Sequence, residues 1–591
     1  MQIGRTVLVP LLIVGLAGLL GADETAPPTA SPGPDPASAL LGTWAAARTF
    51  GPALRGPIEV RDPVAPRAAL GGFVARGAAD GGGGGLVFRF PGDRGELRLP
   101  ARLRGARIDA MWVQPTMLTG GARYASPVAL AAVAPGVWRG RVAPLDDQVR
   151  MTLHVVRGAD GRVGAFLRDP LFNAGRRLRT MSVAVDGRRV TFTPSSAAPA
   201  APMLVAPLTG DDALTLTLPP AAGLPPLAFV RRAGAGDPPS NFAYRRPQAT
   251  GDGWAIASAS EVGIAPAALV ALARFAAGSA PTGVTSPDVH AVAIARHGKL
   301  IFDDYFAGFD DATPHDTRSA GKTYADMLVG AAILAGTPIR DDTPLLRLFP
   351  QETGLANPDP RKARITVGDA LSMSTGLDCD DDDDTSAANE STMQAQTRQP
   401  DWYRFMLDTR MVRDPGTKAV YCSASINLAG GAVAGAARAW LPAFFAQHVA
   451  VPLQMQRYAL NLTPTGQMYL GGGAYVRPRD FLKIGQVFLD GGTWHGRRIV
   501  PRDWVARSWT ARRALGPGDG YGYAWHVRAF AAGARTYRDY EAQGNGGQVL
   551  AVFPQLDLAV MMMQGNYQNF TTWGATRDAI LRRVIAAVEH P

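Results

Sequence analysis

Hydrophobic and polar residues alternate along residues 40–235, in short runs such as GLVFRF, QVRMTLHVV and DALTLTLP. A period of two residues is typical of β-strands with one buried face. Gly, Pro and Asp-Gly turns separate the runs, and the Asp-Gly within VAVDGRRVTF predicts a two-residue hairpin turn. We find no long helical pattern, so this region is predicted to be an antiparallel β domain, a sandwich or barrel in one or two lobes.

The pattern changes after a Pro- and Gly-rich stretch at 236–254, which is typical of a linker. Helical spacing then appears in APAALVALARFAAG and in the terminal ATRDAILRRVIAAVEH. Two hairpins, turning at His297-Gly298 and at Pro554 to Asp557, enclose a mixed helical middle. Residues 255–591 are therefore predicted to be an antiparallel sheet, made from both ends of the domain, with flanking helices and a helical subdomain. The whole chain would be an α+β multidomain protein.

The N-terminus has the pattern of an export signal, with Arg5 ahead of an apolar core and a small residue before Asp23. We predict a signal peptide at 1–22, a Pro/Ala-rich spacer at 23–39, and a periplasmic or secreted protein. An uncleaved membrane anchor is the alternative, although the apolar run is shorter than the roughly 20 residues that span a bilayer.

Composition excludes several classes of function. The 591 residues carry a net charge of +10, but only five of the 60 basic residues are lysines and none lies in 40–235. There is no basic helix with interleaved aromatic residues, no phosphate-binding glycine loop and no zinc spacing. We therefore expect no nucleic-acid partner, no metal and no cofactor.

Cys379 and Cys422 are the two cysteines of the chain. In an exported protein an even pair indicates a disulfide, with two buried free thiols as the alternative. The acidic run DCDDDDDT, from Asp378 to Thr385, lacks the ligand spacing of a known calcium loop, so a solvated loop is the preferred interpretation. Trp402 and Tyr403 fit either the wall of a substrate cleft or a helix core.

The stretch TRSAGKTYADMLVGAAIL combines Ser319 and Lys322 at the start of an apolar helix. Residues three apart share one helix face, and the free N–H groups at a helix start favour negative charge. Ser319 therefore fits a nucleophile, and burial is expected to lower the pKa of Lys322 towards the range of a general base. The alternative is a capped helix with a surface lysine.

Two later stretches contain further candidates. YCSASINLAGG places Tyr421, which can relay a proton, two residues before Ser423. QGNGGQVLAV places Gly546 and Gly547 at the mouth of a strand, where the Gln548 N–H fits an oxyanion donor. Considered singly, Tyr421 could be a core aromatic residue and the glycines a turn.

In this order, Ser-x-x-Lys, Tyr-x-Ser and a Gly-Gly strand resemble the serine β-lactamase and penicillin-binding protein superfamily. The resemblance is stronger to its β-lactamase-related branch, which includes class C β-lactamases, esterases and 6-aminohexanoate-dimer hydrolases. ITVGDALSMSTGLD, PGTKAVYCSASINLAGG and GGGAYVRPRDFLKIGQVFLDGG also match. The resemblance covers roughly 255–591. It implies an acyl-enzyme on Ser319, with Lys322 and Tyr421 as the acid and base groups and the Ser319 and Gln548 N–H groups as oxyanion donors.

Two positions depart from the family pattern. Ser423 stands where the tyrosine motif often has asparagine, and Asn545 stands where β-lactamases have the lysine of Lys-Thr-Gly. A cation for a substrate carboxylate is therefore missing from that position. This favours an esterase or amidase, acting on a small-molecule or short peptide acyl substrate, over a true β-lactamase.

The same departures leave a second hypothesis of another class. The chain could be a penicillin-binding-like sensor or envelope binding protein with little or no turnover. The large β domain would then hold a partner. Whether the chain is a hydrolase or a binding protein, we expect the β domain to associate with the cell envelope.

Overall fold

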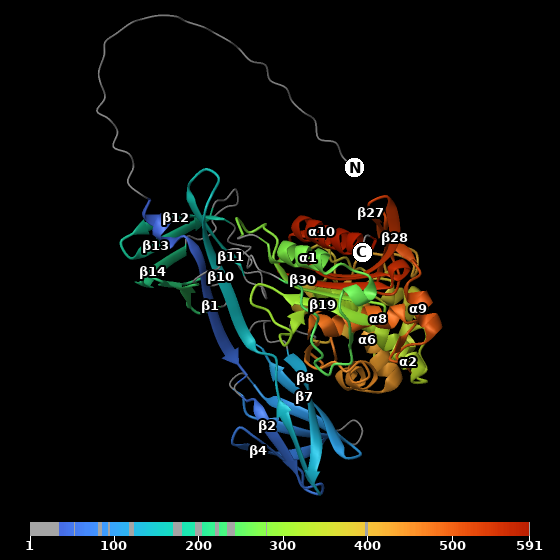
Figure 1. The fold of residues 1–591 in the computed structure, drawn as a ribbon. Helices are drawn as coiled ribbons and strands as arrows, with labels where there is room; N and C mark the ends of the chain where they lie inside the picture. Colours follow the sequence, from blue (N-terminus) through green and yellow to red (C-terminus); the bar gives the residue numbers. More distant parts are fainter. Residues whose placement is uncertain are drawn as a thin grey trace, which may run out of the picture.

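The computed structural model describes most of the chain, in two β lobes and one helix-rich body (Figure 1). The predicted signal peptide at 1–22, most of the predicted spacer and the first part of the predicted linker lie outside the described residues. The described residues are 35–52, 54–80, 85–92, 95–116, 123–168, 180–194, 204–218, 224–232, 243–278, 281–395 and 400–589.

The first β lobe is a closed antiparallel barrel, capped by the short 3-10 helix η1 (Pro36–Leu40). It closes because its last strand pairs with its first. Trp44, Leu153, Phe192 and Phe229 are among the apolar side chains of its core. The strands are β1 (Gly42–Gly51), β10 (Asp147–Arg157), β11 (Val163–Arg168), β12 (Met181–Asp186), β13 (Arg189–Pro194), β14 (Leu204–Gly210), β15 (Ala213–Leu216) and β16 (Leu227–Arg231).

The second β lobe closes in the same way, since its last strand, β9, pairs with both β2 and β8. Phe88, Trp112 and Leu130 belong to its apolar core. The predicted β domain is therefore two barrels. Of the predicted alternatives, the structure has a barrel and not a sandwich, and two lobes and not one. The strands are β2 (Gly56–Arg61), β3 (Arg67–Leu70), β4 (Phe73–Asp80), β5 (Gly85–Phe90), β6 (Leu97–Arg104), β7 (Arg107–Pro115), β8 (Arg123–Ala134) and β9 (Val137–Val142).

The helix-rich body is built on a nine-stranded sheet. Its order is β17-β19-β18-β30-β29-β28-β27-β26-β25, so a hairpin from the start of the domain lies beside one from the end, as the sequence predicts. The two predicted turns fall between β18 and β19 and between β29 and β30. The strands are β17 (Ala255–Ile256), β18 (Val289–Arg296), β19 (Lys299–Tyr305), β25 (Arg513–Gly516), β26 (Asp519–Tyr521), β27 (His526–Ala532), β28 (Arg535–Gly544), β29 (Gln548–Phe553) and β30 (Leu558–Gln564).

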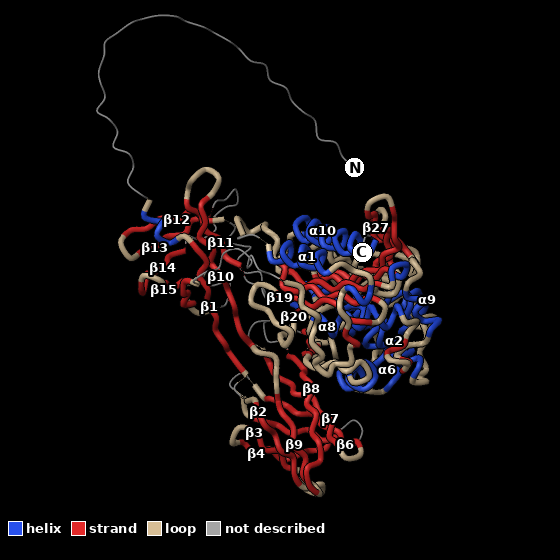
Figure 2. Tube along the Cα trace, viewed as in Figure 1, coloured by secondary structure: helices blue, strands red, loops and turns tan. Residues whose placement is uncertain are grey.

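Helices cover both faces of this sheet (Figures 1 and 2). α1 (Pro266–Ala277) and α10 (Phe570–Glu589) pack on one face, within one apolar cluster. α2 (Thr323–Leu334) and α8 (Pro478–Leu489) belong to the cluster on the other face, which continues into the helical subdomain. The remaining α-helices are α3 (Val367–Leu371), α4 (Glu390–Ala395), α5 (Trp402–Asp408), α6 (Ser423–Ala437), α7 (Leu441–Phe445) and α9 (Arg502–Ser508).

The second half of the predicted linker is part of the folded body. Asp252 is almost fully buried and forms ion pairs with Arg477 at 3.2 Å and Arg479 at 2.6 Å. The Trp254 indole N–H donates to the carbonyl of Arg479. These interactions hold residues 252–254 against α8, within the stretch that composition predicts to be a linker.

No single helix among the described residues is long and apolar enough to cross a membrane. By length and composition only, the bent pair of α6 with Leu441–Ala450 passes that test. Most of α6 is buried in the core of the helical subdomain.

Candidate active site

Ser319 lies in a short 3-10 turn, η5 (Arg318–Lys322), that leads into α2. The sequence predicted a regular helix start here. Arg318 instead has a positive φ of 48°, a conformation that costs a non-glycine residue free energy. Its backbone N–H donates to Asp316 Oδ1 at 2.8 Å, and its side chain forms an ion pair with the same carboxylate at 2.9 Å. Asp316 thus stabilises the sharp turn that presents Ser319.

Lys322 connects the groups of the site. It is 2% exposed, and its Nζ donates to Ser319 Oγ at 2.8 Å and to the carbonyl of Gly471 at 2.5 Å. The Nζ atom is also 4.9 Å from the ring centre of Tyr421. The structure therefore brings Ser319, Lys322 and Tyr421 together, although Tyr421 is about a hundred residues away along the chain.

The expected direction of the Lys322 pKa was wrong. Burial is the largest single influence and lowers the pKa of Lys322, as the sequence suggested. The phenol oxygen of Tyr421 and the carboxylates of Glu390 and Asp381 oppose it, and a hydrogen bond to Tyr421 adds to their effect, so the net pKa is raised. The resting form of Lys322 is therefore the ammonium ion.

Asp381, within the acidic run, holds the segment that carries Tyr421. Its backbone N–H donates to the carbonyl of Tyr421 at 2.9 Å. Its two carboxylate oxygens accept the backbone N–H groups of Ser423, at 2.7 Å, and Glu390, at 2.8 Å, which are the first residues of α6 and α4. Negative charge at two helix N-termini is favourable.

A disulfide joins Cys379 to Cys422 beside this contact. The rest of the acidic run, residues 382–385, is exposed, as a solvated loop would be. Among the residues that the structure describes, no group of three or more His, Cys, Asp or Glu could hold a metal ion. The sequence pattern gave no sign that one aspartate of the run would serve the site.

Glu390 and Tyr469 form a second pair that sequence reasoning missed. The Tyr469 hydroxyl donates to Glu390 Oε1 at 2.5 Å. Burial raises the pKa of Glu390, and the Lys322 charge limits that rise. Trp402 packs edge-on against Tyr469, with ring centres 5.1 Å apart, and so supports this pair.

Tyr403, the other aromatic residue considered for a cleft wall, packs against Phe349 in the core of the helical subdomain. The helix-core alternative therefore holds for Tyr403. Trp402 is also buried, but it contacts a residue of the site.

The strand that lies against the nucleophile is β28, through its last residue, Gly544. A Cβ atom there would lie 2.4 Å from the carbonyl oxygen of Thr317 and 3.1 Å from the backbone N of Ala320, so only glycine fits. Gln548 starts the next strand, opposite Gly544, and its buried side chain exchanges hydrogen bonds with the backbone of Gln564.

The turn between these strands has Gly546 and Gly547 at φ values of 97° and 100°. The Asn545 side chain accepts the backbone N–H of Gln568 at 2.5 Å, so it is tied to the loop before α10. Ser423 is fully buried, and among the described residues its Oγ has no hydrogen-bond partner.

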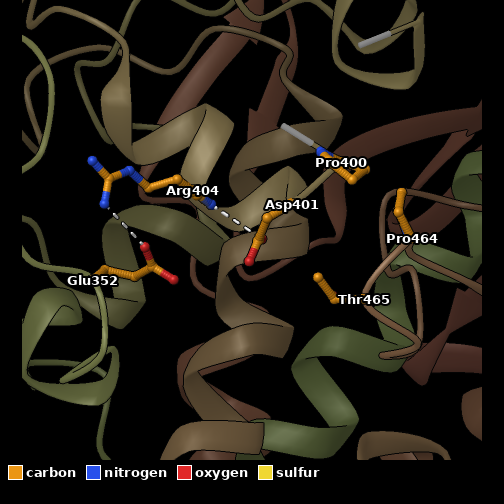
Figure 3. Close-up of a pocket in the computed structure, with 6 residues that line it drawn as sticks. All are labelled: Glu352, Pro400, Asp401, Arg404, Pro464 and Thr465. Carbon is orange, nitrogen blue, oxygen red and sulfur yellow. Dashed lines mark hydrogen bonds and ion pairs between the residues drawn. The ribbon is translucent and has the colours of Figure 1, made fainter. Parts of the chain in front are cut away.

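A pocket of about 320 Å³ lies beside the helical subdomain (Figure 3). Arg404 forms an ion pair with Glu352 at 3.6 Å, and the Asp401 carboxylate accepts the N–H groups that begin α5. The charged groups that line the pocket are therefore paired within the protein, and no predicted catalytic residue lines the pocket. The lining residues are Glu352, Pro400, Asp401, Arg404, Pro464 and Thr465.

Comparison with known proteins places the C-terminal half of the chain in one family. The family model described as Beta-lactamase matches residues 285–582, which is half of the chain and includes every candidate catalytic residue. A 6-aminohexanoate-dimer hydrolase of Paenarthrobacter ureafaciens is 25% identical over 225 residues, covering 36% of this chain and 55% of the relative. The chain thus spans about half the length of that relative.

Similar solved structures include a putative 6-aminohexanoate-dimer hydrolase from Bacillus anthracis, with a TM-score of 0.43 and 16% identity. That match covers 51% of this chain and 79% of the other. A penicillin-binding protein homologue from Caulobacter crescentus has a TM-score of 0.43 and 13% identity, over 55% of this chain and 99% of the other.

Proposed function

Because the chain belongs to the beta-lactamase family, we propose that residues 255–591 are a serine hydrolase that cleaves an ester or amide through an acyl-enzyme on Ser319. The observation that carries this proposal is the 2.8 Å hydrogen bond from Lys322 Nζ to Ser319 Oγ. It holds one hydroxyl at a strained turn, beside a buried cation and a phenol, where a nucleophile would be needed.

The charge state of Lys322 assigns the proton transfers. An ammonium cannot accept the Ser319 proton, so the base in this mechanism is Tyr421 as its phenolate, whose oxygen is hydrogen-bonded to that ammonium and takes the proton to become the phenol. Ser319 Oγ bonds to the substrate carbonyl carbon, and Tyr421 returns the proton to the leaving oxygen or nitrogen as its bond to carbon breaks. Water repeats these steps on the acyl-enzyme and restores the Ser319 hydroxyl.

The developing oxyanion requires two N–H donors. The Ser319 backbone N–H is the first. The sequence pattern favours the Gln548 N–H as the second, whereas the close approach of Gly544 to the nucleophile turn favours the amide of its neighbour Asn545. Asn545 lies in the turn between β28 and β29, and Gln548 begins β29 directly after that turn.

The charges around the site support an uncharged acyl substrate, a small molecule or a short peptide. Asn545 supplies no cation at the end of β28, and its side chain is tied to Gln568. The carboxylates of Glu390 and Asp381 lie close enough to influence Lys322. A substrate carboxylate at that position would meet no cation from Asn545, which favours an esterase or amidase over a β-lactamase.

The test is a Ser319→Ala variant of the full chain, assayed on short acyl esters, linear amides, D-Ala-D-Ala peptides and a chromogenic cephalosporin. Loss of the nucleophile should lower kcat/KM on the preferred ester or amide by about 10,000-fold and abolish labelling by a fluorophosphonate. Ser391→Ala, at an exposed position of α4, is the matched control and should leave both unchanged. Wild-type turnover by Ser319→Ala would contradict the proposal.

The same probe separates an enzyme from a binding protein. Rapid labelling with turnover of a substrate would indicate a hydrolase, whereas stable labelling or no labelling, without turnover, would indicate a sensor or envelope binding protein. Export remains part of the proposal, and the Cys379–Cys422 disulfide supports an oxidising compartment.

A further inference from the structure

The segment between strands β21 (Tyr458–Leu462) and β22 (Ala474–Val476) forms one wall of the site. Its Gly471 carbonyl accepts the Lys322 ammonium. Its Gly472 lies so close to the nucleophile turn that a Cβ there would be 3.4 Å from the backbone N of Ser319. Whatever fixes this segment therefore fixes the surroundings of the nucleophile.

The second barrel supplies the partner strand of that wall. β8 pairs with β21 in an antiparallel register that joins Arg123 to Leu462, Tyr124 to Asn461 and Ala125 to Leu460. β21 pairs on its other side with β22, and β22 with the short strand β20 (His315–Asp316) that leads into the nucleophile turn. One continuous sheet thus connects the barrel to the residue two positions before Arg318.

Side chains follow the same route. The ring of Tyr124 meets the ring of Tyr475 edge-on, with centres 5.4 Å apart, and both rings are almost fully buried. Tyr475 is paired with Asp316 across β22 and β20. Asp316 in turn holds the strained Arg318 that precedes Ser319.

Beyond the shared sheet, the second barrel contacts the body through apolar side chains and through a hydrogen bond. Met111, Val113 and Ala125 point out of the barrel into the apolar core that contains α2. The Arg123 guanidinium donates to the carbonyl of Pro464, at 2.6 Å, in the turn that follows β21. A detachable module would show neither a shared core nor a shared sheet.

We propose that the second barrel is a structural part of the active site, and that Tyr124 is a positioning residue for the Arg318–Ser319 turn. Tyr124 acts through Tyr475 and Asp316, and it does not touch the reacting atoms. Displacements of about 1 Å at a nucleophile lower rates by up to about 100-fold, so a support of this kind affects the chemical step. The expected effect on the rate rests on the proposed function, whereas the expected effect on the structure of the Arg318–Ser319 turn does not.

The test compares Tyr124→Ala with Tyr124→Phe in the full chain. Removal of the ring should lower kcat about tenfold, with KM within twofold of wild type, and should speed amide hydrogen exchange at residues 315–322. Tyr124→Phe keeps the ring contact and should restore most of the rate. Leu103→Ala, at an exposed position of the same barrel, is the control and should change neither reading.

A folded Tyr124→Ala protein with wild-type kcat and wild-type exchange at 315–322 would overturn the proposal. Should Tyr124→Ala not fold, Arg123→Ala carries the test, with the same two readings and the same overturning result. Hydrogen exchange is independent of catalysis, so it decides the structural proposal even if Ser319 proves not to be the nucleophile.

Discussion

The ammonium of Lys322 is surrounded by groups from three distant segments, contributed by Asp381 and Glu390, by Tyr421 and by Gly471. They supply carboxylate, phenol and carbonyl oxygens, which together outweigh the cost of burying the ammonium. A lysine so stabilised acts as a fixed positive charge. In the mechanism that we propose, the proton-transfer role then belongs to Tyr421, so the position of Tyr421 determines the rate.

Asp381 is the residue that sets this position. In an Asp381→Asn variant, one of the two N–H groups that begin α4 and α6 would face an amide NH₂ in place of an oxygen. We expect kcat to fall about tenfold and the melting temperature to fall as well, because one charged hydrogen bond contributes about 1.5–3 kcal/mol to stability. Steady-state kinetics and thermal unfolding measure both.

Asp384→Asn, in the exposed part of the same acidic run, removes the same charge without these contacts and is the matched control. Equal losses in the two variants would mean that the net charge of the run, and not the contacts of Asp381, determines the rate.

Asp326, on α2, makes stability depend on pH. Its carboxyl group is fully buried and accepts hydrogen bonds from Ser508 at 2.7 Å and Trp525 at 3.0 Å. Burial raises its pKa to about 8 in the folded protein, against 3.8 as the ordinary value. Between these two values the folded state holds a proton that the unfolded state releases, so the contribution of this group to stability falls as pH rises towards 8.

An Asp326→Asn variant should lose that dependence. Its stability relative to wild type should improve from pH 5 to pH 8, by on the order of 1 kcal/mol for each pH unit. Denaturant unfolding at several pH values measures the slope. The Asn amide can still accept from Trp525 and donate to Ser508, whose hydroxyl proton can then turn from residue 326 to the Trp504 carbonyl, 2.9 Å from its Oγ. A slope unchanged from wild type would show that other groups cause it.

At the scale of elements, the disulfide ties the loop before α4 to the start of α6. It closes a loop of 43 residues, and the chain-entropy model gives a stabilisation of about 4 kcal/mol for a loop of that length. Cys422 is also the N-cap of α6, because its sulfur accepts the Ser425 N–H. The cross-link and the cap therefore act on the same helix end, one residue from Tyr421.

The double variant Cys379→Ser, Cys422→Ser separates these two roles, since serine is itself a favourable N-cap. We expect a markedly lower melting temperature and a several-fold lower kcat, because the Tyr421 segment loses its covalent anchor. Dithiothreitol should reduce the wild type towards the same values and leave the variant unchanged. A variant with wild-type stability would show that the bond contributes little.

The elements that sequence predicted best are those set by local pattern. The turns at His297-Gly298 and at Pro554 to Asp557 follow from alternation interrupted by turn residues, and both occur. The start of α2 was predicted less well. Its 3-10 turn depends on Asp316 holding Arg318, and that contact gives no signal in the spacing of apolar residues.

For the candidate site, local spacing found Ser319, Lys322 and Tyr421, because each lies in a short motif of a known family. It missed Asp381, Glu390 and Tyr469, whose contacts cross long separations in the chain. For the same reason it gave the wrong direction for the Lys322 pKa. An apolar helix after Lys322 is visible in the sequence, whereas the charges that surround it are not.

At the scale of the whole molecule, the barrels and the body share more contacts than the sequence predicts. The change of composition near residue 240 predicts a linker at 236–254 between two regions of different pattern. Asp252 of that stretch forms an ion pair with Arg477 at the start of α8, and Arg168 of the first barrel forms an ion pair with Asp288 of the body at 3.2 Å. The second barrel joins the body through the β8–β21 ladder. Composition shows where the pattern of the sequence changes, but it does not show which parts of the chain pack against one another.

The β8–β21 ladder also imposes an order on biosynthesis. The ribosome completes β8 long before it reaches β21, so the barrels can fold while an edge of β8 has no partner. An open edge of this kind readily pairs with the wrong chain. We therefore expect a chain that ends before β21 to expose the Arg123–Ala125 edge of β8 and to aggregate more readily than the full chain. Chaperone demand should be concentrated before β21 is synthesised, when the Ser319 turn has not yet acquired its neighbouring strand.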